Sequence, residues 1–200
     1  PTVNPNWPQA GGNPNHAMHH IKTSGNIQEA WSVNIGAGSD NQERLIAQPV
    51  VAEGRVYTMD ANSEISAFDA KTGDDIWTTE ITPDDEDDGH IGGGLAFEDG
   101  KLFVTTGFAE VISLDASNGK ILWRRNLEAP FRTAPTVRGN RVFALTLSNK
   151  LHALNGSTGE NLWSHSGIEE VTSFLGGASP AVDSGVVIAP YSSGELVALK

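Results

Sequence analysis

A run of five consecutive carboxylates is the first feature with chemical potential. Asp84, Asp85, Glu86, Asp87 and Asp88 form one acidic segment, and clusters of oxygen ligands of this kind hold calcium. The run lacks the alternating Asp-x-Asp-x-Asp-Gly spacing that wraps a single ion. We therefore expect a solvated loop rather than a calcium site.

Histidines near the N-terminus form a second candidate cluster. His16, His19 and His20 lie close together in a segment rich in Gly, Asn and Pro. The chain contains no cysteine, and no carboxylate stands at ligand spacing from these histidines, so we expect surface side chains rather than a zinc site. His152 lies beside Leu151 in a predicted strand, where we expect a packed or half-exposed side chain.

Motifs for nucleophilic or phosphate chemistry are absent from the sequence. There is no Gly-x-Ser-x-Gly, no His-Glu-x-x-His and no phosphate-binding glycine loop, because the glycines at 92–94 precede a predicted strand rather than a helix. The lack of cysteine also excludes a thiolate nucleophile and a disulfide scaffold. The residues therefore predict no catalytic site, no metal site and no cofactor.

The overall charge narrows the classes of partner. Lys and Arg number 13 against 25 Asp and Glu, which gives a net charge of −12 and disfavours nucleic acid and anionic lipid surfaces. Hydrophobic residues make up 38% of the chain, enough for a folded core. No apolar stretch reaches the roughly 18 residues of a membrane span. Because the chain begins at Pro1, we expect a signal or anchor segment upstream.

A repeated motif organises the chain. The sequence FDAKTGDDIW at 68–77 recurs as LDASNGKILW at 114–123 and as LNGSTGENLW at 154–163, at spacings of 46 and 40 residues. Turns upstream of each motif keep the same register, and a fourth turn follows 45 residues after the third. Each unit contains about four short β-rich runs separated by Gly or Asn turns.

Four-stranded units of about 40 to 45 residues are typical of a β-propeller, in which each unit is a blade. We therefore predict an all-β fold, a β-propeller of four-stranded antiparallel blades with about four blades in this chain. The predicted parts are an N-terminal extended segment at 1–29, a lone closing strand at 30–35, blades at 47–81, 91–127 and 132–165, and an incomplete blade at 177–200.

Four tryptophans stand at one position of successive units. They are Trp31, Trp77, Trp123 and Trp163. A cofactor platform normally uses one such residue, whereas one indole in each unit indicates packing between neighbouring blades, with on the order of 200 Å² buried apiece. Trp7 lies outside this register, and its role is open between covering the start of the sheet and another function.

The three motif copies resemble the tryptophan-docking repeat of the pyrroloquinoline quinone (PQQ)-like propellers, which have eight blades. The resemblance spans residues 30–200, and WPQAGGNPNH at 7–16 is similar to the opening segment of that superfamily. Two branches share the repeat, the quinoprotein dehydrogenases and the BamB lipoproteins of outer-membrane β-barrel assembly (BAM). The chain lacks the adjacent cysteine pair of PQQ alcohol dehydrogenases, and its compact blades carry no concentration of polar ligands, which favours the BamB branch.

The BamB resemblance implies a non-enzymatic scaffold without a cofactor. The implied location is the periplasm at the inner face of the outer membrane, with a lipid anchor outside this sequence. The implied partners are BamA-like periplasmic domains and unfolded outer-membrane proteins. Two alternatives stay open: a fragment of a PQQ-dependent quinoprotein dehydrogenase, whose PQQ and calcium ligands would lie outside these residues, and a binding propeller of another extracellular kind.

The resemblance also implies a partner-binding loop between the third and fourth blades. BamB carries a Leu-x-Leu-Arg-Gly type segment there, shortly before a proline, and this segment contacts BamA. The corresponding stretch here is TSFLGGASP, which begins at Thr172. Phe174 matches a leucine and Gly176 matches the glycine, but Leu175 stands where the arginine is expected. The hydrophobic contact is therefore implied and the charged one is not.

The strand count predicts half of an eight-bladed propeller. The fourth unit ends at ELVALK, residues 195–200, as its third strand, while Ala30–Ile35 has the pattern of an isolated outer strand. An open strand edge is a template for pairing. We expect Ala30–Ile35 of one chain to complete the fourth blade of a second chain, which gives a two-fold homodimer. A monomeric ring of four blades is the alternative.

Overall fold

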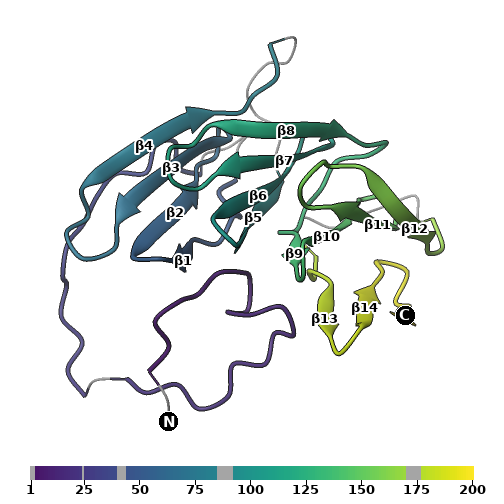
Figure 1. Cartoon of the computed structure of the whole chain (residues 1–200), viewed down its shortest axis with the longest axis horizontal. Helices are drawn as coiled ribbons and strands as arrows, with labels where there is room; N and C mark the ends of the chain where they lie inside the picture. Colours follow the sequence, from purple (N-terminus) through teal and green to yellow (C-terminus); the bar gives the residue numbers. More distant parts are fainter. Residues whose placement is uncertain (1–2, 24, 40–43, 85–91, 170–176) are drawn as a thin grey trace.

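The computed structural model describes residues 3–23, 25–39, 44–84, 92–169 and 177–200, and its strands form four antiparallel sheets (Figure 1). The first sheet consists of β1 (Val50–Ala52), β2 (Arg55–Met59), β3 (Glu64–Asp69) and β4 (Asp75–Glu80). The second consists of β5 (Gly93–Glu98), β6 (Lys101–Thr106), β7 (Glu110–Asp115) and β8 (Ile121–Asn126). The third consists of β9 (Thr136–Val137), β10 (Arg141–Leu145), β11 (Lys150–Asn155) and β12 (Asn161–Ser166). The fourth consists of β13 (Ala181–Asp183), β14 (Val186–Pro190) and β15 (Leu196–Leu199).

Strands that follow one another in sequence are neighbours in every sheet. The first two strands of a sheet are joined by tight turns at Glu53–Gly54, Asp99–Gly100 and Ser184–Gly185, where both residues have positive φ. Two-residue hairpin loops of this geometry match the right-handed twist of the strands they join. The predicted all-β fold of propeller-like blades is therefore confirmed, with three four-stranded sheets and one three-stranded sheet.

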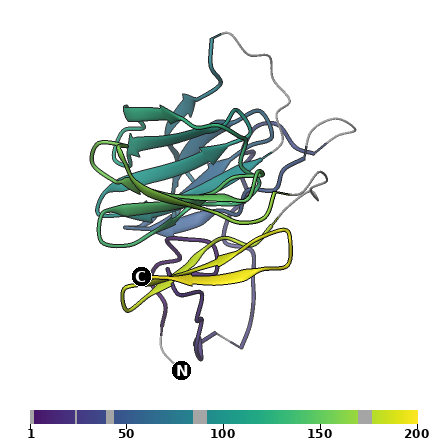
Figure 2. The same cartoon turned by 90° about the vertical axis from the view of Figure 1, so that its right-hand side faces the viewer.

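Each sheet packs face to face with the next, and a separate hydrophobic cluster fills each of the three seams. Successive residues of a strand point to opposite faces, so one strand serves two seams. On β6, Leu102 and Val104 face the first sheet while Phe103 faces the third. The seam between the third and fourth sheets is filled by Phe143 and Leu151 together with side chains of β13 and β14. Figure 2 views the molecule from the side of this fourth sheet.

The N-terminal segment follows the inner strands of all four sheets (Figure 1). The cross-strand registers place Val51, Phe97, Val137 and Val182 at one equivalent position. The backbone N–H of each of these residues donates to an acceptor of the N-terminal segment. The acceptors, in the same order, are the carbonyl of Trp7 at 2.8 Å, the carbonyl of Pro8 at 2.7 Å, the side-chain Oε1 of Gln9 at 2.9 Å and the carbonyl of Pro14 at 2.7 Å. The segment therefore satisfies inner-strand backbone groups that would otherwise lack partners.

The open question about Trp7 is settled by this arrangement. Trp7 also donates its backbone N–H to the carbonyl of Val51 and forms a β-bridge with it. It therefore covers the start of the first sheet.

The segment 30–35, predicted to be a lone closing strand of a blade completed by another chain, has no ladder partner among the described residues of this chain, and its pairing stays a prediction. These six residues are described and form no strand. A strand requires a ladder partner, and none of the described residues of this chain pairs with the segment. Trp31 still holds the segment against the first sheet, as shown below.

The described part of the chain contains no helix long and apolar enough to cross a membrane.

Candidate functional site

Three of the four repeat tryptophans bind the turn of the next sheet in one geometry. Each indole Nε1–H donates to the carbonyl of the residue that follows the Asp or Asn of the repeat motif. The pairs are Trp31 with Ala70 at 3.2 Å, Trp77 with Ala116 at 3.0 Å, and Trp123 with Gly156 at 3.0 Å. Trp77 and Trp123 thus pack in the seams between neighbouring sheets, as predicted, and Trp31 attaches a segment without strand structure to the first sheet.

The motif glycine lets each indole approach the turn. At Gly159, with φ +70°, an added Cβ would lie 2.7 Å from Cε3 of Trp123. At Gly119, with φ +73°, it would lie 2.5 Å from Cε3 of Trp77. The glycine therefore serves both a left-handed turn conformation and a close ring contact. This pairing explains why the glycine and the tryptophan repeat together.

Trp163 keeps the repeat position, but its indole donates no equivalent hydrogen bond to a described residue. Its ring packs against Phe143 with centroids 6.0 Å apart, much as Trp123 packs against Phe103 at 6.2 Å. Trp163 is nevertheless 36% exposed and borders a cavity of about 240 Å³ between the third and fourth sheets. Lys200 holds the repeat position of Asp69, and no described turn receives the Trp163 indole.

The loop between β12 and β13 contains the residues implied to bind a partner. Thr172, Phe174, Leu175 and Gly176 lie outside the described residues. Both flanks of this loop are attached to the body of the protein.

On the first flank, the Ile168 N–H donates to Glu195 at 3.0 Å, and its carbonyl accepts from the Asn149 amide at 2.7 Å. On the second flank, the Ser179 hydroxyl donates to the carbonyl of Ala134 at 2.8 Å. The Ile168 side chain is 59% exposed beside the loop, which makes it an apolar contact point on this face.

The outer edge of β15 is a second candidate for partner contact. β15 pairs with β14 on one side, and no described strand pairs with its other side. Leu196 on this strand is 72% exposed. A free edge that carries an exposed leucine can accept another strand.

The sequence predicts no metal site from the acidic run or the N-terminal histidines; among the described residues, no group of three His, Cys, Asp or Glu side chains converges. Of the acidic run, 85–88 lies outside the described residues. His19 and His20 are exposed as expected, whereas His16 is half-buried, and burial lowers its pKa. His152 is 4% exposed, which agrees with the prediction of a packed side chain.

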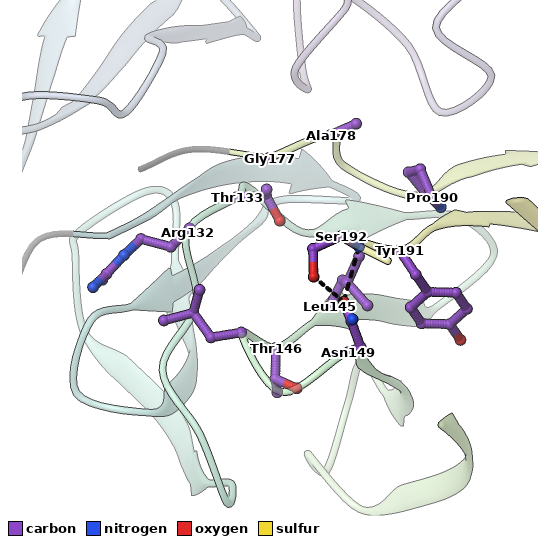
Figure 3. A pocket seen from close by; sticks show the side chains of 11 residues that line it. Arg132, Thr133, Leu145, Thr146, Asn149, Gly177, Ala178, Pro190, Tyr191 and Ser192 are labelled. Carbon is purple, nitrogen blue, oxygen red and sulfur yellow. Dashed lines mark hydrogen bonds between the residues drawn. The ribbon is translucent and has the colours of Figure 1, made fainter. Parts of the chain in front are cut away.

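Sequence reasoning missed a cavity of about 270 Å³ between the third and fourth sheets (Figure 3). Arg132 and Tyr191 lie at opposite ends of it in this view, with Thr133 between them. Arg132 also borders a smaller cavity, of about 140 Å³, where the segments that lead into the inner strands meet the N-terminal segment at Ala10. A repeat comparison could have found Arg132, because the equivalent residues are Ile46, Gly92 and Gly177.

Two family models match the sequence. The family described as outer membrane protein assembly factor BamB matches residues 61–200. The β-propeller domain of glucose, ethanol and alcohol dehydrogenases matches residues 10–96.

Comparison with individual proteins also finds similarity to BamB. An uncharacterised protein of Rickettsia conorii is 35% identical over 159 residues, which are 79% of this chain and 38% of that protein. The BamB protein of Burkholderia pseudomallei is 27% identical over 139 residues, which are 70% of this chain and 34% of that protein. The crystal structure of BamB from Moraxella catarrhalis superposes with a TM-score of 0.63 at 20% identity, over 82% of this chain and 48% of that one.

The chain thus spans less than half the length of these relatives. Because the BamB model covers more than half of the chain and the Rickettsia relative exceeds 30% identity, the family is established. The protein belongs to the PQQ-like β-propeller repeat family that includes BamB.

Proposed function

We propose that this protein is a non-enzymatic scaffold of outer-membrane β-barrel assembly, located in the periplasm and binding BamA-like periplasmic domains. The observation that carries the proposal is the match of the BamB family over residues 61–200, which contains the loop between β12 and β13. Unfolded outer-membrane proteins are a second class of client in this proposal.

The geometry around that loop supports a docking role. Ile168 and Leu196 expose apolar side chains on the third-to-fourth-sheet side of the molecule. Glu195, the residue before Leu196, links the two positions, because its carboxylate accepts a hydrogen bond from the backbone N–H of Ile168. Exposed apolar side chains on a rigid support are the usual anchors of a protein interface.

The test is direct binding between this chain and purified BamA periplasmic domains by biolayer interferometry. Phe174→Ala and Ile168→Glu are expected to weaken binding about tenfold or more, as central apolar contacts do. Leu122→Glu is the matched control, because Leu122 is 47% exposed on β8, far along the chain from the loop. Full binding by both loop variants, or no binding by the unmodified chain, would contradict the proposal.

The dehydrogenase alternative is supported by the match of the dehydrogenase propeller domain to residues 10–96. The described residues contain no cluster of acidic or histidine ligands that fits the calcium of such enzymes. Titration with PQQ and calcium separates the two functions, because a dehydrogenase fragment would retain quinone absorbance after gel filtration and a scaffold would not.

A further inference from the structure

The N-terminal residues 6–14, called the strap below, cross the inner edges of all four sheets (Figure 1). Each sheet directs one backbone N–H at the strap from the same repeat position; these groups belong to Val51, Phe97, Val137 and Val182. The strap supplies one acceptor to each group, which is the Gln9 side chain at the third sheet and a backbone carbonyl at the others. A row of backbone donors at strand edges binds an extended chain with little regard to its sequence.

Gln9 gives this row its one requirement on side chains. Its Oε1 accepts from the Val137 N–H at 2.9 Å, and its Nε2 donates to the Val137 carbonyl at 2.7 Å. Only the primary amides of Gln and Asn carry a donor and an acceptor in this arrangement. Gln9 is 2% exposed, although its neighbours Pro8 and Ala10 are half-buried. A ligand of the row therefore needs a primary amide at the third sheet and backbone carbonyls at the other three.

The strap lies outside the hydrophobic core. The three seam clusters contain no residue of the described N-terminal part, 3–23 and 25–39. The largest side chain of the strap, Trp7, is half-buried and lies against Gly12 of the strap itself, where an added Cβ would be 3.1 Å from the ring.

The chain that follows the strap is exposed at 18–23 and 25–30, so it forms a tether between the strap and the first sheet. A segment that is held by hydrogen bonds and buries few apolar contacts opens more readily than the sheets beneath it. The strap can therefore leave the inner edges while the sheets stay folded.

We propose that the inner edges of the four sheets bind an extended peptide of a partner protein, and that the strap occupies this surface as a ligand of the same chain until the peptide displaces it. The peptide presents backbone carbonyls to Val51, Phe97 and Val182 and a Gln side chain to Val137. The contacts of the strap define this occupant, because they show which groups the row accepts. The strap carries no charged side chain, so the matching peptide is uncharged. The inference is independent of the scaffold function proposed above.

Amide hydrogen exchange of the unmodified chain tests whether the strap leaves the sheets on its own. Phe103 is the reference, because it pairs with Ala96 on one side and with Ser113 on the other, and is released only when its sheet opens. The four N–H groups of the row are expected to exchange at similar rates, corrected for intrinsic exchange, and at least about tenfold faster than Phe103. Row amides as slow as Phe103 would show that the strap opens only with the whole fold, which overturns the proposal.

Binding of a separate peptide tests the surface itself. The probe is a fluorescein-labelled peptide of residues 3–16, and fluorescence anisotropy measures its affinity for the full 200-residue chain. The strap of the same molecule competes at a high effective concentration, which keeps the affinity of the unmodified chain low. Gln9→Leu in the chain removes two hydrogen bonds of the strap, so the peptide is expected to bind this variant at least about tenfold more tightly.

Two controls locate the contact. A peptide that itself carries Gln9→Leu should bind the Gln9→Leu chain at least about tenfold more weakly than the native peptide does. Gln28→Leu, at an exposed position outside the strap, should leave the chain with the affinity of the unmodified one. Equal binding of the two peptides, equal binding by the Gln9→Leu and unmodified chains, or no binding to the Gln9→Leu chain overturns the assignment. Circular dichroism checks folding; if the Gln9→Leu chain does not fold, the exchange rates and the ratio of the two peptides on the unmodified chain decide.

Discussion

The side-chain amide of Gln9 pairs with the backbone of Val137 as a neighbouring strand would. Its Oε1 accepts from the Val137 N–H at 2.9 Å, and its Nε2 donates to the Val137 carbonyl at 2.7 Å. The two residues are 128 positions apart in the sequence, and Gln9 is 2% exposed. The N-terminal segment is thus part of the folded structure rather than a tail, because it hydrogen-bonds to the inner strands of all four sheets.

Removal of the Gln9 amide should destabilise the protein. Gln9→Leu leaves the Val137 N–H and carbonyl buried without partners, and we expect a loss of about 1–3 kcal/mol in the free energy of unfolding. Urea denaturation measures the loss. Gln28→Leu, at an exposed position, is the control and should change stability by less than about 0.5 kcal/mol. Equal stability of the two variants would show that the amide pairing is not needed.

The repeat tryptophans should differ in their contribution to stability. Trp123→Phe removes a hydrogen bond to Gly156 and ring contacts with Gly159, and we expect a loss of about 1–3 kcal/mol. Trp163→Phe removes no such hydrogen bond and should cost less than about 1 kcal/mol. Thermal unfolding of the two variants side by side makes the comparison. A larger loss in Trp163→Phe would contradict the weaker attachment of the exposed Trp163 indole.

The motif glycine should tolerate substitution less well than a hairpin glycine of similar φ. Gly159→Ala adds a clash with the Trp123 ring to the strain of φ +70°. Gly185→Ala has similar strain at φ +77°, but its Cβ would meet no atom within 4 Å. We expect Gly159→Ala to be less stable by about 1–3 kcal/mol than Gly185→Ala, the usual cost of overpacking. Denaturant midpoints with equal m-values would measure the difference, and identical midpoints would rule out the ring contact as its cause.

Acidification should destabilise the third sheet through His152. Burial is the main cause that lowers the pKa of this imidazole, and the nearby Lys150 acts in the same direction, against Asn161 and Glu128. The unfolded chain then binds the proton more readily, so stability is complete above the unfolded pKa of about 6.5 and falls as the pH drops toward the lower folded pKa. His152→Gln should flatten the stability profile between about pH 7 and 5. A profile as steep as that of the unmodified chain would refute the role of His152.

The free edge of β15 should support self-association of this 200-residue chain. We predict a solution mass near twice 21.2 kDa by light scattering, with the segment 30–35 of one copy beside β15 of the other. Leu196→Lys places a charge on the edge and should shift the mass toward the monomer. Leu122→Lys on β8 is the control for added charge. A mass of 21.2 kDa for the unmodified chain would leave the four sheets as a monomer.

The sequence alone was sufficient to predict the β-strands, their grouping into four-stranded units and the repeated position of the tryptophans. These features depend on interactions within about 40 residues, such as the turn that Gly159 closes four residues before Trp163. Turn chemistry and the alternation of side chains act locally, so a repeated motif predicts a repeated unit. The pattern of residues 30–35 does not show where a neighbouring strand would come from, and no described strand of this chain pairs with the segment.

Only the tertiary structure decided how the four sheets are joined and where the cavities between them lie. Gln9 and Val137 meet across 128 residues, and no sequence period indicates that contact. Arg132 is an ordinary basic residue in the sequence. Its placement depends on Gly92, because a Cβ at that position would lie 2.9 Å from an Nη atom of Arg132. Burial and unsatisfied donors are properties of the packed molecule, because they arise only when distant segments exclude water together.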